Sequence, residues 1–338
     1  MLDNKTILIT GGTGSLGQKF TKIVFQRYNP KKVIIFSRDE YKQYEMSKVF
    51  PDTKYEIRYF LGDIRDKARL YRAFEGVDYV IHAAALKQVP ALEYNPMEAV
   101  KTNVMGADNI VDAAIDRGVQ KVIALSTDKA VNPINLYGAT KVVAEKTFVA
   151  ANAYAGGKVK FSVVRYGNVL GSRGSVIPLF LDFKRKGIKE FLITDLRMTR
   201  FWITLEESVE LVLKALENAV GGETYVPIIP SMKIVDLAKA IEPACTFKTI
   251  GIRPGEKIHE SLISEDEARN TKIFKDTYCI LNPFFENERV HKVYDTCPNP
   301  AEGFIYRSDK NEKWLTIEAL RELIGIYENI PVFTSVDR

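Results

Sequence analysis

The chain has 338 residues, 46% of them hydrophobic, so it can bury a large core in one α/β unit or two lobes. Its 48 Lys and Arg residues are interleaved with 43 Asp and Glu residues, and the formal net charge is +5. This pattern argues against nucleic acid as a partner and suits an anionic small substrate. The sequence has neither a signal-peptide pattern nor an apolar run near the ~18 residues of a membrane span. We therefore expect a cytoplasmic protein with no membrane partner.

The cysteines are too few and too scattered to suggest a bound metal or a disulfide framework. Cys245, Cys279 and Cys297 are widely spaced, without a CxxC pair or neighbouring histidines. Buried or free thiols are the simplest interpretation, and we predict no metal site.

Residues 5–165 alternate β-branched runs with amphipathic stretches, the runs being TILIT, KKVIIFS, YEIRYFLGD, VDYVIHAAA, KVIALST and VKFSVVRY. This alternation predicts an α/β fold with a Rossmann-type doubly wound parallel sheet, which binds ligands beyond the carboxyl ends of its strands. After residue 165 the pattern becomes irregular. We expect a first domain over 1–165, extended by about 195–220, a smaller C-terminal substrate-binding lobe over 166–330 and a tail over 331–338.

A glycine-rich turn follows the first predicted strand in TILITGGTGSLG. Gly12, Gly14 and Gly17 have the GxGxxG spacing of a turn that lets the backbone approach a pyrophosphate at a helix N-terminus. Gly11 adds a GxxGxxG pattern that resembles the short-chain dehydrogenase/reductase superfamily. We expect a dinucleotide here, and the alternative is an ordinary turn.

The end of the second predicted strand indicates which dinucleotide binds. Ser37 and Arg38 stand where the cofactor ribose should lie, and a hydroxyl with a guanidinium suits a 2′-phosphate, which favours NADP over NAD. The alternative is that Arg38 is a solvated surface residue and Asp39 holds the ribose. By resemblance to the superfamily, Asp63 and Ile64 border the adenine.

The segment STDKAVNPINLYGATK, residues 126–141, holds a phenol and an amine that suit proton transfer. Tyr137 and Lys141 open a predicted helix after KVIALST, and their i, i+4 spacing places them on one helix face. A nearby ammonium lowers the pKa of a phenol, so Tyr137 can act as a base toward a sugar hydroxyl while Lys141 binds the nicotinamide ribose. Thr127 is placed to hydrogen-bond the same hydroxyl. The three residues resemble the catalytic set of the superfamily.

Asp128 and Lys129 in the same segment are not needed for simple hydride transfer. A carboxylate beside an amine fits a reaction that removes a proton and expels water. The alternative is that both are surface residues of a charged loop.

Six motifs together resemble the inverting UDP-N-acetylglucosamine 4,6-dehydratases that begin pseudaminic acid biosynthesis. The motifs lie between residues 11 and 260 and are GGTGSLG, HAAALKQVP, LSTDKAVNPINLYGATK, RYGNVLGSRGSVIPLF, MTRFW and RPGEKIHE. The resemblance implies a cytoplasmic, homo-oligomeric hydro-lyase that uses NADP. Its product would be UDP-2-acetamido-2,6-dideoxy-β-L-arabino-hexos-4-ulose.

The resemblance also implies a role for each catalytic residue. Tyr137 takes the C4 hydroxyl proton as hydride leaves C4, Lys129 removes the C5 proton, and Asp128 protonates the departing C6 hydroxyl. Hydride then returns to C6, and reprotonation of C5 on the opposite face inverts that centre. The roles of Asp128 and Lys129 could be exchanged. Lys129 carries the argument for inversion, because retaining dehydratases of the deoxythymidine diphosphate glucose branch resemble TDE at this place.

Two sets of binding residues follow from the same resemblance, since arginines can hold a pyrophosphate and a glutamate can accept ribose hydroxyls. The cofactor set is Gly11, Thr13, Gly14, Ser15, Leu16, Gly17, Ser37, Arg38, Asp39, Lys42, Asp63, Ile64, His82, Ala83, Ala84, Lys87, Asn103, Tyr137 and Lys141. The substrate set is Lys87, Asn168, Val169, Arg173, Val176, Thr194, Arg200, Arg253 and Glu256. Arg200 is the weaker member, because MTRFW could owe its pattern to core packing by Phe201 and Trp202.

Other functions remain open at this point. A nucleotide-sugar epimerase or ketoreductase would use Thr127, Tyr137 and Lys141 and leave the Asp128–Lys129 pair idle, and a retaining UDP-N-acetylglucosamine 4,6-dehydratase is a further alternative. An NADP-sensing regulatory protein would need no catalytic tyrosine. Helical patterns over 96–118 and 137–157 are apolar enough to form a dimer seam, although both could simply cover the sheet.

Overall fold

The computed structural model describes residues 1–171, 176–284 and 288–328, and the chain divides into two compact units. The first unit comprises Met1–Tyr166, Leu205–Ile228 and Ser261–Tyr306. The second comprises Gly167–Thr204, Ile229–Glu260 and Arg307–Arg338. The predicted tail over 331–338 lies outside the described residues.

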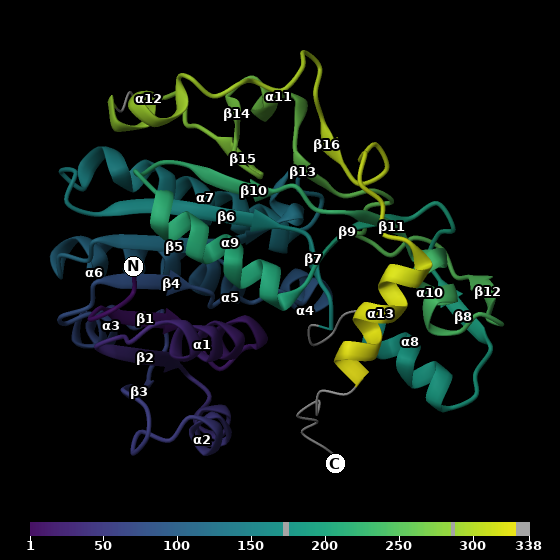
Figure 1. Ribbon diagram of the computed structural model, residues 1–338, viewed down its shortest axis with the longest axis horizontal. Coiled ribbons are helices and arrows are strands. Elements are labelled where there is room, and N and C mark those ends of the chain that lie inside the picture. The colour runs from purple at the N-terminus through teal and green to yellow at the C-terminus, as the bar shows by residue number, and fades with distance from the viewer. Residues whose placement is uncertain (172–175, 285–287, 329–338) are drawn as a thin grey trace. The chain divides into compact units, whose positions relative to one another are not determined.

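A nine-stranded sheet forms the middle of the first unit within the described residues (Figure 1). Its order is β14-β15-β10-β6-β5-β4-β1-β2-β3. Neighbours from β10 to β3 pair in parallel, and β15 pairs antiparallel with both β10 and β14. The strands are β1 (Thr6–Thr10), β2 (Lys32–Ser37), β3 (Ile57–Leu61), β4 (Tyr79–His82), β5 (Lys121–Thr127), β6 (Lys160–Tyr166), β10 (Thr224–Pro227), β14 (Thr271–Phe274) and β15 (Thr277–Ile280).

The predicted Rossmann-type sheet is confirmed. The six β-branched runs form β1 to β6 in the order β3-β2-β1-β4-β5-β6, whose direction of winding reverses between β1 and β4. Ligands bind beyond the carboxyl ends of the strands at such a reversal. Strands β14 and β15 belong to residues 261–306, which the sequence analysis placed in the second lobe. Their four-residue runs carry too little hydrophobic pattern to reveal which sheet they join.

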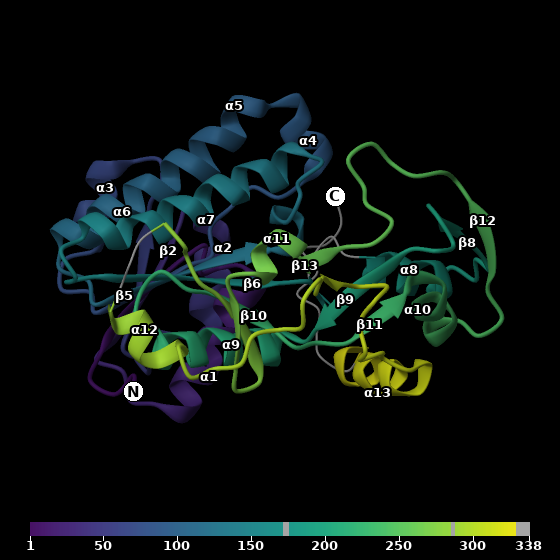
Figure 2. The same cartoon turned by 90° about the horizontal axis from the view of Figure 1, so that it is seen from above.

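Helices cover both faces of this sheet, as a parallel sheet requires. The helices of the first unit are α1 (Ser15–Arg27), α2 (Glu40–Val49), α3 (Lys67–Ala73), α4 (Val89–Tyr94), α5 (Pro96–Ala99), the π-helical η1 (Val100–Met105), α6 (Gly106–Asp116), the 3-10 turn η2 (Asp128–Ala130), α7 (Leu136–Tyr154), α9 (Leu205–Asn218), α11 (Glu265–Ala268) and α12 (Glu288–Tyr294). Figure 2 shows α3, α6 and α7 on one face and α1 and α9 on the other.

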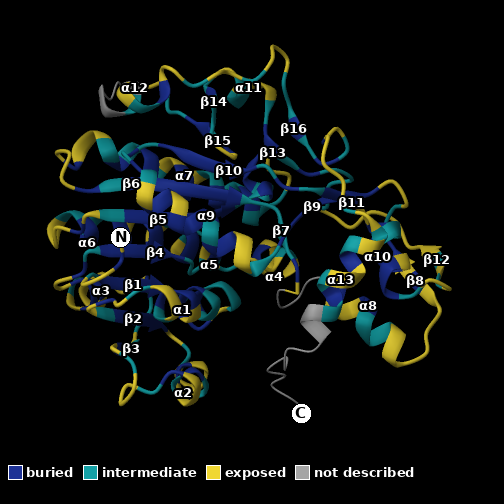
Figure 3. Cartoon of the chain, viewed as in Figure 1, coloured by how far each residue is buried: buried dark blue, intermediate teal, exposed yellow. Residues whose placement is uncertain are grey.

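Each face of the sheet has its own hydrophobic core. Ile7 and Ile9 of β1 belong to the cluster with α1 and α9, whereas Leu8 belongs to the cluster with α3, α6 and α7. This division follows from the alternation of side chains along a strand. The buried strands stand out in Figure 3. A strand buried on both faces holds its carboxyl-end loop in a fixed place, which is where the predicted functional residues lie.

The second unit is built from short strands and three helices among the described residues. Its elements are β7 (Asn168–Val169), α8 (Val176–Arg185), β8 (Glu190–Ile193), β9 (Thr199–Ile203), β11 (Ser231–Lys233), α10 (Ile234–Ile241), β12 (Thr246–Thr249) and α13 (Ile317–Glu328). Strand β9 pairs with β7 and β11, and β8 pairs with β12. The fully buried Phe191, Trp202, Leu237 and Leu320 share one core. Phe201 and Trp202 of MTRFW are both core residues, as the packing alternative anticipated.

The described residues contain no helix with both the length and the apolar character needed to cross a bilayer. Within the same residues, no group of three His, Cys, Asp or Glu side chains is arranged to hold a metal ion. The three cysteines are free thiols, of which Cys279 is buried.

Candidate active site

The turn between β1 and α1 needs glycine at several positions. Gly11 has φ of +65°, and a Cβ there would lie 2.9 Å from Cα of Ala84. A Cβ at Gly17 would lie 2.4 Å from the Gly12 carbonyl oxygen. Gly14 is the N-cap residue of α1 and has no side chain to occupy the first backbone N–H groups. The turn therefore fits a dinucleotide pyrophosphate, which would take hydrogen bonds from this helix N-terminus. Thr13, Ser15 and Leu16 complete the turn.

At the end of β2, most polar groups already have partners within the protein. Asp39 caps α2, accepting from the Lys42 backbone N–H at 2.9 Å and pairing with Lys42 Nζ at 2.7 Å. The Ser37 hydroxyl oxygen accepts from Gln43 at 3.1 Å. Arg38 keeps 54% of its side chain exposed and lies 3.7 Å from Asp63. The guanidinium is thus more accessible to a ligand than the Asp39 carboxylate.

Asp63, which follows β3, has a closer basic partner than Arg38. Arg65 donates through Nε and Nη2 to Asp63 at 3.0 and 2.8 Å. Burial opposes ionisation of Asp63, but the Arg65 hydrogen bonds outweigh it and hold the pKa of that carboxyl below its ordinary value. The Ile64 side chain packs in the core, where a Cβ at Gly106 would lie 2.7 Å from its Cδ1. Any contact of Ile64 with adenine would therefore involve its backbone.

The residues after β4 lie between the glycine turn and α7. His82 is buried, and its Nδ1 lies 2.8 Å from the Thr10 hydroxyl. Burial, with a further contribution from Lys141, lowers the pKa of His82 to about 3, so the imidazole is neutral in the core. Asn103 accepts from the Leu86 backbone N–H at 2.8 Å and donates to Thr140 at 3.0 Å. Asn103 therefore fixes the loop that carries Ala83, Ala84 and Lys87.

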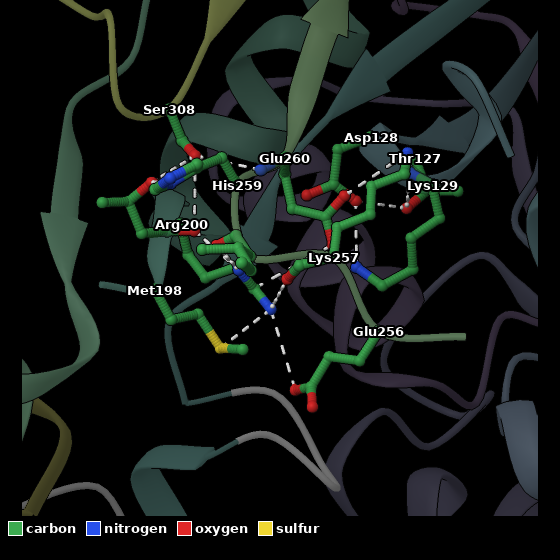
Figure 4. Close-up of polar contacts among 12 residues, drawn as sticks. Thr127, Asp128, Lys129, Met198, Arg200, Glu256, Lys257, His259, Glu260 and Ser308 are labelled. Carbon is green, nitrogen blue, oxygen red and sulfur yellow. Dashed lines mark hydrogen bonds and ion pairs between the residues drawn. The ribbon is translucent and has the colours of Figure 1, made fainter. Parts of the chain in front are cut away.

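The catalytic candidates converge at the end of β5. The Thr127 hydroxyl donates to Asp128 Oδ1 at 2.9 Å, and Lys129 Nζ donates to the same oxygen at 3.1 Å (Figure 4). The Asp128 side chain is 1% exposed, whereas that of Lys129 is 29% exposed. Asp128 Oδ2 is buried and has no hydrogen-bond partner among the described residues. One carboxylate oxygen is thus held by Thr127 and Lys129, and the other keeps unused hydrogen-bonding capacity.

The first turn of α7 packs directly against the backbone of Lys129. A Cβ at Gly138 would lie 2.1 Å from the Lys129 carbonyl oxygen, so only glycine permits this approach. Asn135 caps α7 by accepting from the Gly138 backbone N–H at 2.8 Å. The sequence analysis missed Gly138, although its place between Tyr137 and Lys141 is a signal that can be read.

Tyr137 and Lys141 lie on α7 as predicted, but their electrostatics differ from the expectation. Lys141 Nζ donates to the Leu125 carbonyl oxygen at 2.7 Å, and burial lowers the pKa of Lys141 to about 8 while Glu145 opposes that shift. Burial raises the pKa of Tyr137, and Asp128 adds to the rise. The predicted lowering of this pKa by Lys141 is wrong for the chain by itself. Lys129 and Thr127 oppose the rise, and burial exceeds them.

Lys87 belongs to both predicted sets, and a nearby cation acts on it. Desolvation of its amine lowers the pKa of Lys87, and the charge on Lys129 lowers it further. The Lys129 amine is therefore close enough to disfavour the charged form of Lys87.

In the second unit, Arg200 contacts backbone oxygens. Its guanidinium donates to the carbonyl oxygens of Lys257 and Ile258, both at 2.9 Å, and lies 3.7 Å from Glu256 (Figure 4). The Arg200 side chain is 7% exposed. In this structure Arg200 shapes the loop that contains RPGEK.

A buried hydroxyl cluster supports the same loop. Thr199 Oγ1 lies 2.8 Å from His259 Nδ1 and 2.7 Å from Ser308 Oγ, and the Glu260 backbone N–H donates to Ser308 at 3.0 Å. Sequence analysis missed Thr199 and Ser308, because no local spacing connects them.

The other substrate candidates belong to several elements of the second unit. Asn168 and Val169 form β7, Val176 begins α8, and Thr194 follows β8. Arg253 and Glu256 share the loop, in which the Arg253 backbone N–H donates to the Glu256 carboxylate at 3.4 Å. Arg173 lies outside the described residues.

Sequence comparison identifies relatives over nearly the whole chain. Residues 7–282 match the family model described as polysaccharide biosynthesis protein. A Campylobacter jejuni protein named UDP-N-acetylglucosamine 4,6-dehydratase (inverting) is 52% identical, covering 96% of this chain and 98% of its own. A Rickettsia massiliae protein named UDP-glucose 4-epimerase is 46% identical, covering 83% of this chain and 84% of its own.

Solved structures show the same fold. Pen from Bacillus thuringiensis has a TM-score of 0.87 at 38% identity, covering 97% of this chain and 99% of its own. DesIV, a dTDP-glucose 4,6-dehydratase from Streptomyces venezuelae solved with NAD, has a TM-score of 0.69 at 20% identity, covering 95% and 98%. The chain therefore belongs to the polysaccharide biosynthesis protein family, within the extended short-chain dehydrogenase/reductase superfamily, together with the inverting UDP-N-acetylglucosamine 4,6-dehydratases.

Proposed function

We propose that this chain catalyses the NADP-dependent 4,6-dehydration of UDP-N-acetylglucosamine with inversion at C5. The observation that carries the proposal is the hydrogen-bonded group of Thr127, Asp128 and Lys129 at the end of β5, held against the helix that presents Tyr137 and Lys141. An oxidoreductase that only moves hydride has no use for the Asp128–Lys129 pair.

The glycine turn fits a nicotinamide dinucleotide, as in the Streptomyces dehydratase that was solved with NAD. When bound, the dinucleotide would supply the redox chemistry, accepting hydride from C4 and returning it to C6. Because Asp39 is occupied by Lys42 while Arg38 is exposed, we favour NADP. We assign the dinucleotide to the first unit and the nucleotide part of the substrate to Arg253 and Glu256 in the second.

The first proton transfer belongs to Tyr137. Its phenolate form takes the proton of the C4 hydroxyl, so that C4 becomes a ketone. Burial raises the pKa of Tyr137, and the nearby cation Lys129 opposes that rise and so favours the phenolate form. Thr127 helps to orient the sugar hydroxyl.

The elimination belongs to Asp128 and Lys129. Moving one proton from Lys129 Nζ to Asp128 Oδ1 across their 3.1 Å hydrogen bond produces a neutral amine and a carboxylic acid. The amine takes the C5 proton, which the C4 ketone acidifies, and the C5–H electron pair forms the C5–C6 double bond. The C6–O bond breaks, and the hydroxyl accepts the Asp128 proton and leaves as water. After hydride reaches C6, C5 regains a proton on its opposite face.

The identity of the product tests this proposal. The chain should convert UDP-N-acetylglucosamine into a 6-deoxy-4-keto sugar, identified by NMR and mass spectrometry. Formation of the C4 epimer without loss of water would contradict the dehydratase proposal. A 4-epimerase is the second candidate because of the 46% identity to the Rickettsia protein of that name.

The biological setting rests on resemblance alone. By likeness to the inverting dehydratases, we place the reaction at the first step of pseudaminic acid biosynthesis, which would supply flagellin glycosylation. A cytoplasmic homo-oligomer is the corresponding prediction for location and assembly.

A further inference from the structure

A buried ion cluster in the first unit lies one helical turn beyond Lys141. Arg165, near the end of β6, donates through Nε and Nη2 to the Glu145 carboxylate at 3.0 and 2.7 Å. It also donates through Nη1 and Nη2 to the Glu267 carboxylate at 3.0 and 2.8 Å. Its remaining N–H donates to the Leu262 carbonyl oxygen at 2.9 Å. All five N–H groups of one guanidinium are therefore used within the protein.

The cluster is well shielded from water. The side chains of Arg165 and Glu145 are 4% and 6% exposed, and that of Glu267 is 27% exposed. Burial opposes ionisation of Glu267, but Arg165 and hydrogen bonds from Ser264 hold the pKa of this carboxyl below its ordinary value. Glu267 therefore stays ionised opposite Arg165. Two planar bidentate pairs on one guanidinium fix distance and orientation more strictly than a single ion pair does.

The cluster joins three segments that surround the catalytic residues. Glu145 follows Tyr137 and Lys141 on α7 at i+8 and i+4, on the same helix face. In the sheet register, Arg165 lies opposite Ser126, one residue before Thr127. Leu262 belongs to β13 (Ser261–Ile263), which packs beside η2, the turn that carries Asp128 and Lys129.

The cluster also fixes the pairing and the direction of the Glu145 carboxylate. Glu145 is a buried carboxylate one turn from the buried amine of Lys141, and it opposes the effect of burial on that amine. With two hydrogen bonds from Arg165, the Glu145 carboxylate stays paired and directed toward β6. Without Arg165, this carboxylate would lose its bidentate partner beside Lys141.

We propose that Arg165 is a positioning residue for the dehydration, holding α7 and the β13–α11 segment in register with β5 so that Tyr137 and Lys141 stay aligned with Asp128 and Lys129. This inference rests on the proposed function. Arg165 touches neither reactant nor cofactor in this account. It acts through Glu145 and Glu267.

The test uses the full chain and two substitutions that keep side-chain size. Glu267→Gln preserves the capping geometry at Ser264 but removes one of the two negative charges that face Arg165. Arg165→Lys keeps the charge but cannot make two bidentate pairs. We expect kcat for dehydration to fall about 10- to 100-fold in both variants, with KM for UDP-N-acetylglucosamine within about twofold of wild type. Hydrogen–deuterium exchange should rise together in peptides covering 261–268 and 128–141.

The matched control is Glu223→Gln. Glu223 is also a fully buried carboxylate of the first unit, accepting from Ser162 at 2.7 Å and from two backbone N–H groups, but it precedes β10 at the amino end of the strand. Its substitution should lower the melting temperature without changing kcat or exchange in 128–141. Unchanged kcat in Glu267→Gln and Arg165→Lys, with an active wild type, would overturn the inference. If wild type forms no dehydrated product, the proposed function fails. The exchange measurement then decides the inference by itself. The inference is wrong if hydrogen–deuterium exchange in 128–141 is the same in the variants as in wild type.

Discussion

The end of β5 and the RPGEK loop both carry charged residues, but the two regions use them differently. At β5, Asp128 keeps one buried oxygen without a partner among the described residues, and its other oxygen holds Lys129. Beside the loop, Arg200 of β9 donates to three backbone carbonyl oxygens, those of Thr199, Lys257 and Ile258. In the proposed reaction the first region therefore presents groups to a reactant, whereas Arg200 stabilises the RPGEK loop.

This comparison shows which sequence signals report chemistry. Asp128 and Lys129 follow a buried strand of a doubly wound sheet, so their place next to a ligand follows from topology. Arg200 lies inside a strand between core residues, where a charged side chain is costly unless its donors are satisfied locally. Besides the Thr199 carbonyl oxygen, its acceptors are the carbonyl oxygens of Lys257 and Ile258, 57 and 58 residues further along the chain, which no spacing rule predicts.

The largest effect is expected when Lys129 is replaced. Lys129→Ala should reduce kcat for dehydration about 10²- to 10⁴-fold, because it removes the group that takes the C5 proton. Oxidation at C4 should be slowed far less, because Thr127 and Tyr137 remain, so reduced cofactor should accumulate in a single-turnover absorbance measurement. Lys146→Ala, on the exposed side of α7, is the control and should leave both steps unchanged. If Lys129→Ala kept its full dehydration activity, the end of β5 would not differ from the Arg200 region in its chemical role.

Gly138 offers a way to separate α7, which carries Tyr137 and Lys141, from η2, which carries Asp128 and Lys129. Gly138→Ala would place a Cβ 2.1 Å from the Lys129 carbonyl oxygen, which must move the first turn of α7 away from η2. We expect kcat to fall about 100-fold and stability to drop by about 1–3 kcal/mol, measured by kinetics and urea unfolding.

The control for that substitution is Gly325→Ala in α13, where no described atom lies within 4 Å of the added Cβ. It should be neutral or stabilising because alanine is the better helix former. A Gly138→Ala variant with wild-type kcat would show that close packing of α7 on η2 is not required.

Arg38 tests the choice of cofactor. Arg38→Ala should weaken NADP binding by about 10- to 100-fold while NAD binding changes by less than about twofold, because only NADP carries a 2′-phosphate for the guanidinium. Calorimetric titration with both dinucleotides measures this, and Arg65→Ala, which loses the partner of Asp63, is a control for general damage. Equal losses for both dinucleotides would speak against a 2′-phosphate site at Arg38.

Arg200 is expected to affect binding more than chemistry. Arg200→Met should raise KM for UDP-N-acetylglucosamine about 5- to 10-fold with kcat nearly unchanged, because the loop loses hydrogen bonds to its backbone. Arg197→Met, at an exposed arginine that pairs with Asp195, is the control. A fall in kcat equal to the change in kcat/KM would instead assign Arg200 to the transition state.

The buried amine of Lys141 is expected to affect how stability depends on pH. Its folded pKa of about 8 is below the unfolded value of about 10.4, so between these pH values the unfolded chain binds more protons and stability rises with pH. Wild type should therefore gain about 1–3 kcal/mol relative to Lys141→Met as pH increases from 7 to 10. Urea unfolding at both pH values measures this difference. A constant difference would mean that Lys141 titrates normally in the fold.

The central sheet could be predicted because each strand from β1 to β6 is a β-branched run separated from the next by a helical pattern. The carboxyl ends of β1, β2 and β5 then placed the glycine turn, Arg38 and the Asp128–Lys129 pair with no need for long-range information. Strands β14 and β15 could not be assigned, because four residues carry little pattern and their antiparallel pairing depends on distant residues.

The electrostatic details were less accessible to sequence reasoning than the positions. The i, i+4 spacing placed Tyr137 beside Lys141, but it could not show that burial would raise the tyrosine pKa. Arg165 joins Glu145 to Glu267, which lies 122 residues further along the chain. This contact forms only when β6, α7 and α11 come together in the fold. The position of a polar group could be predicted where a single strand or helix determines it. It could not be predicted where three elements must first come together.

The most direct test of the dehydration mechanism is to run the wild-type reaction in deuterated water and examine C5 of the product by NMR. The account predicts one deuterium at C5 in the inverted configuration. Product with the original C5 hydrogen, or with deuterium at C5 in the retained configuration, would contradict it.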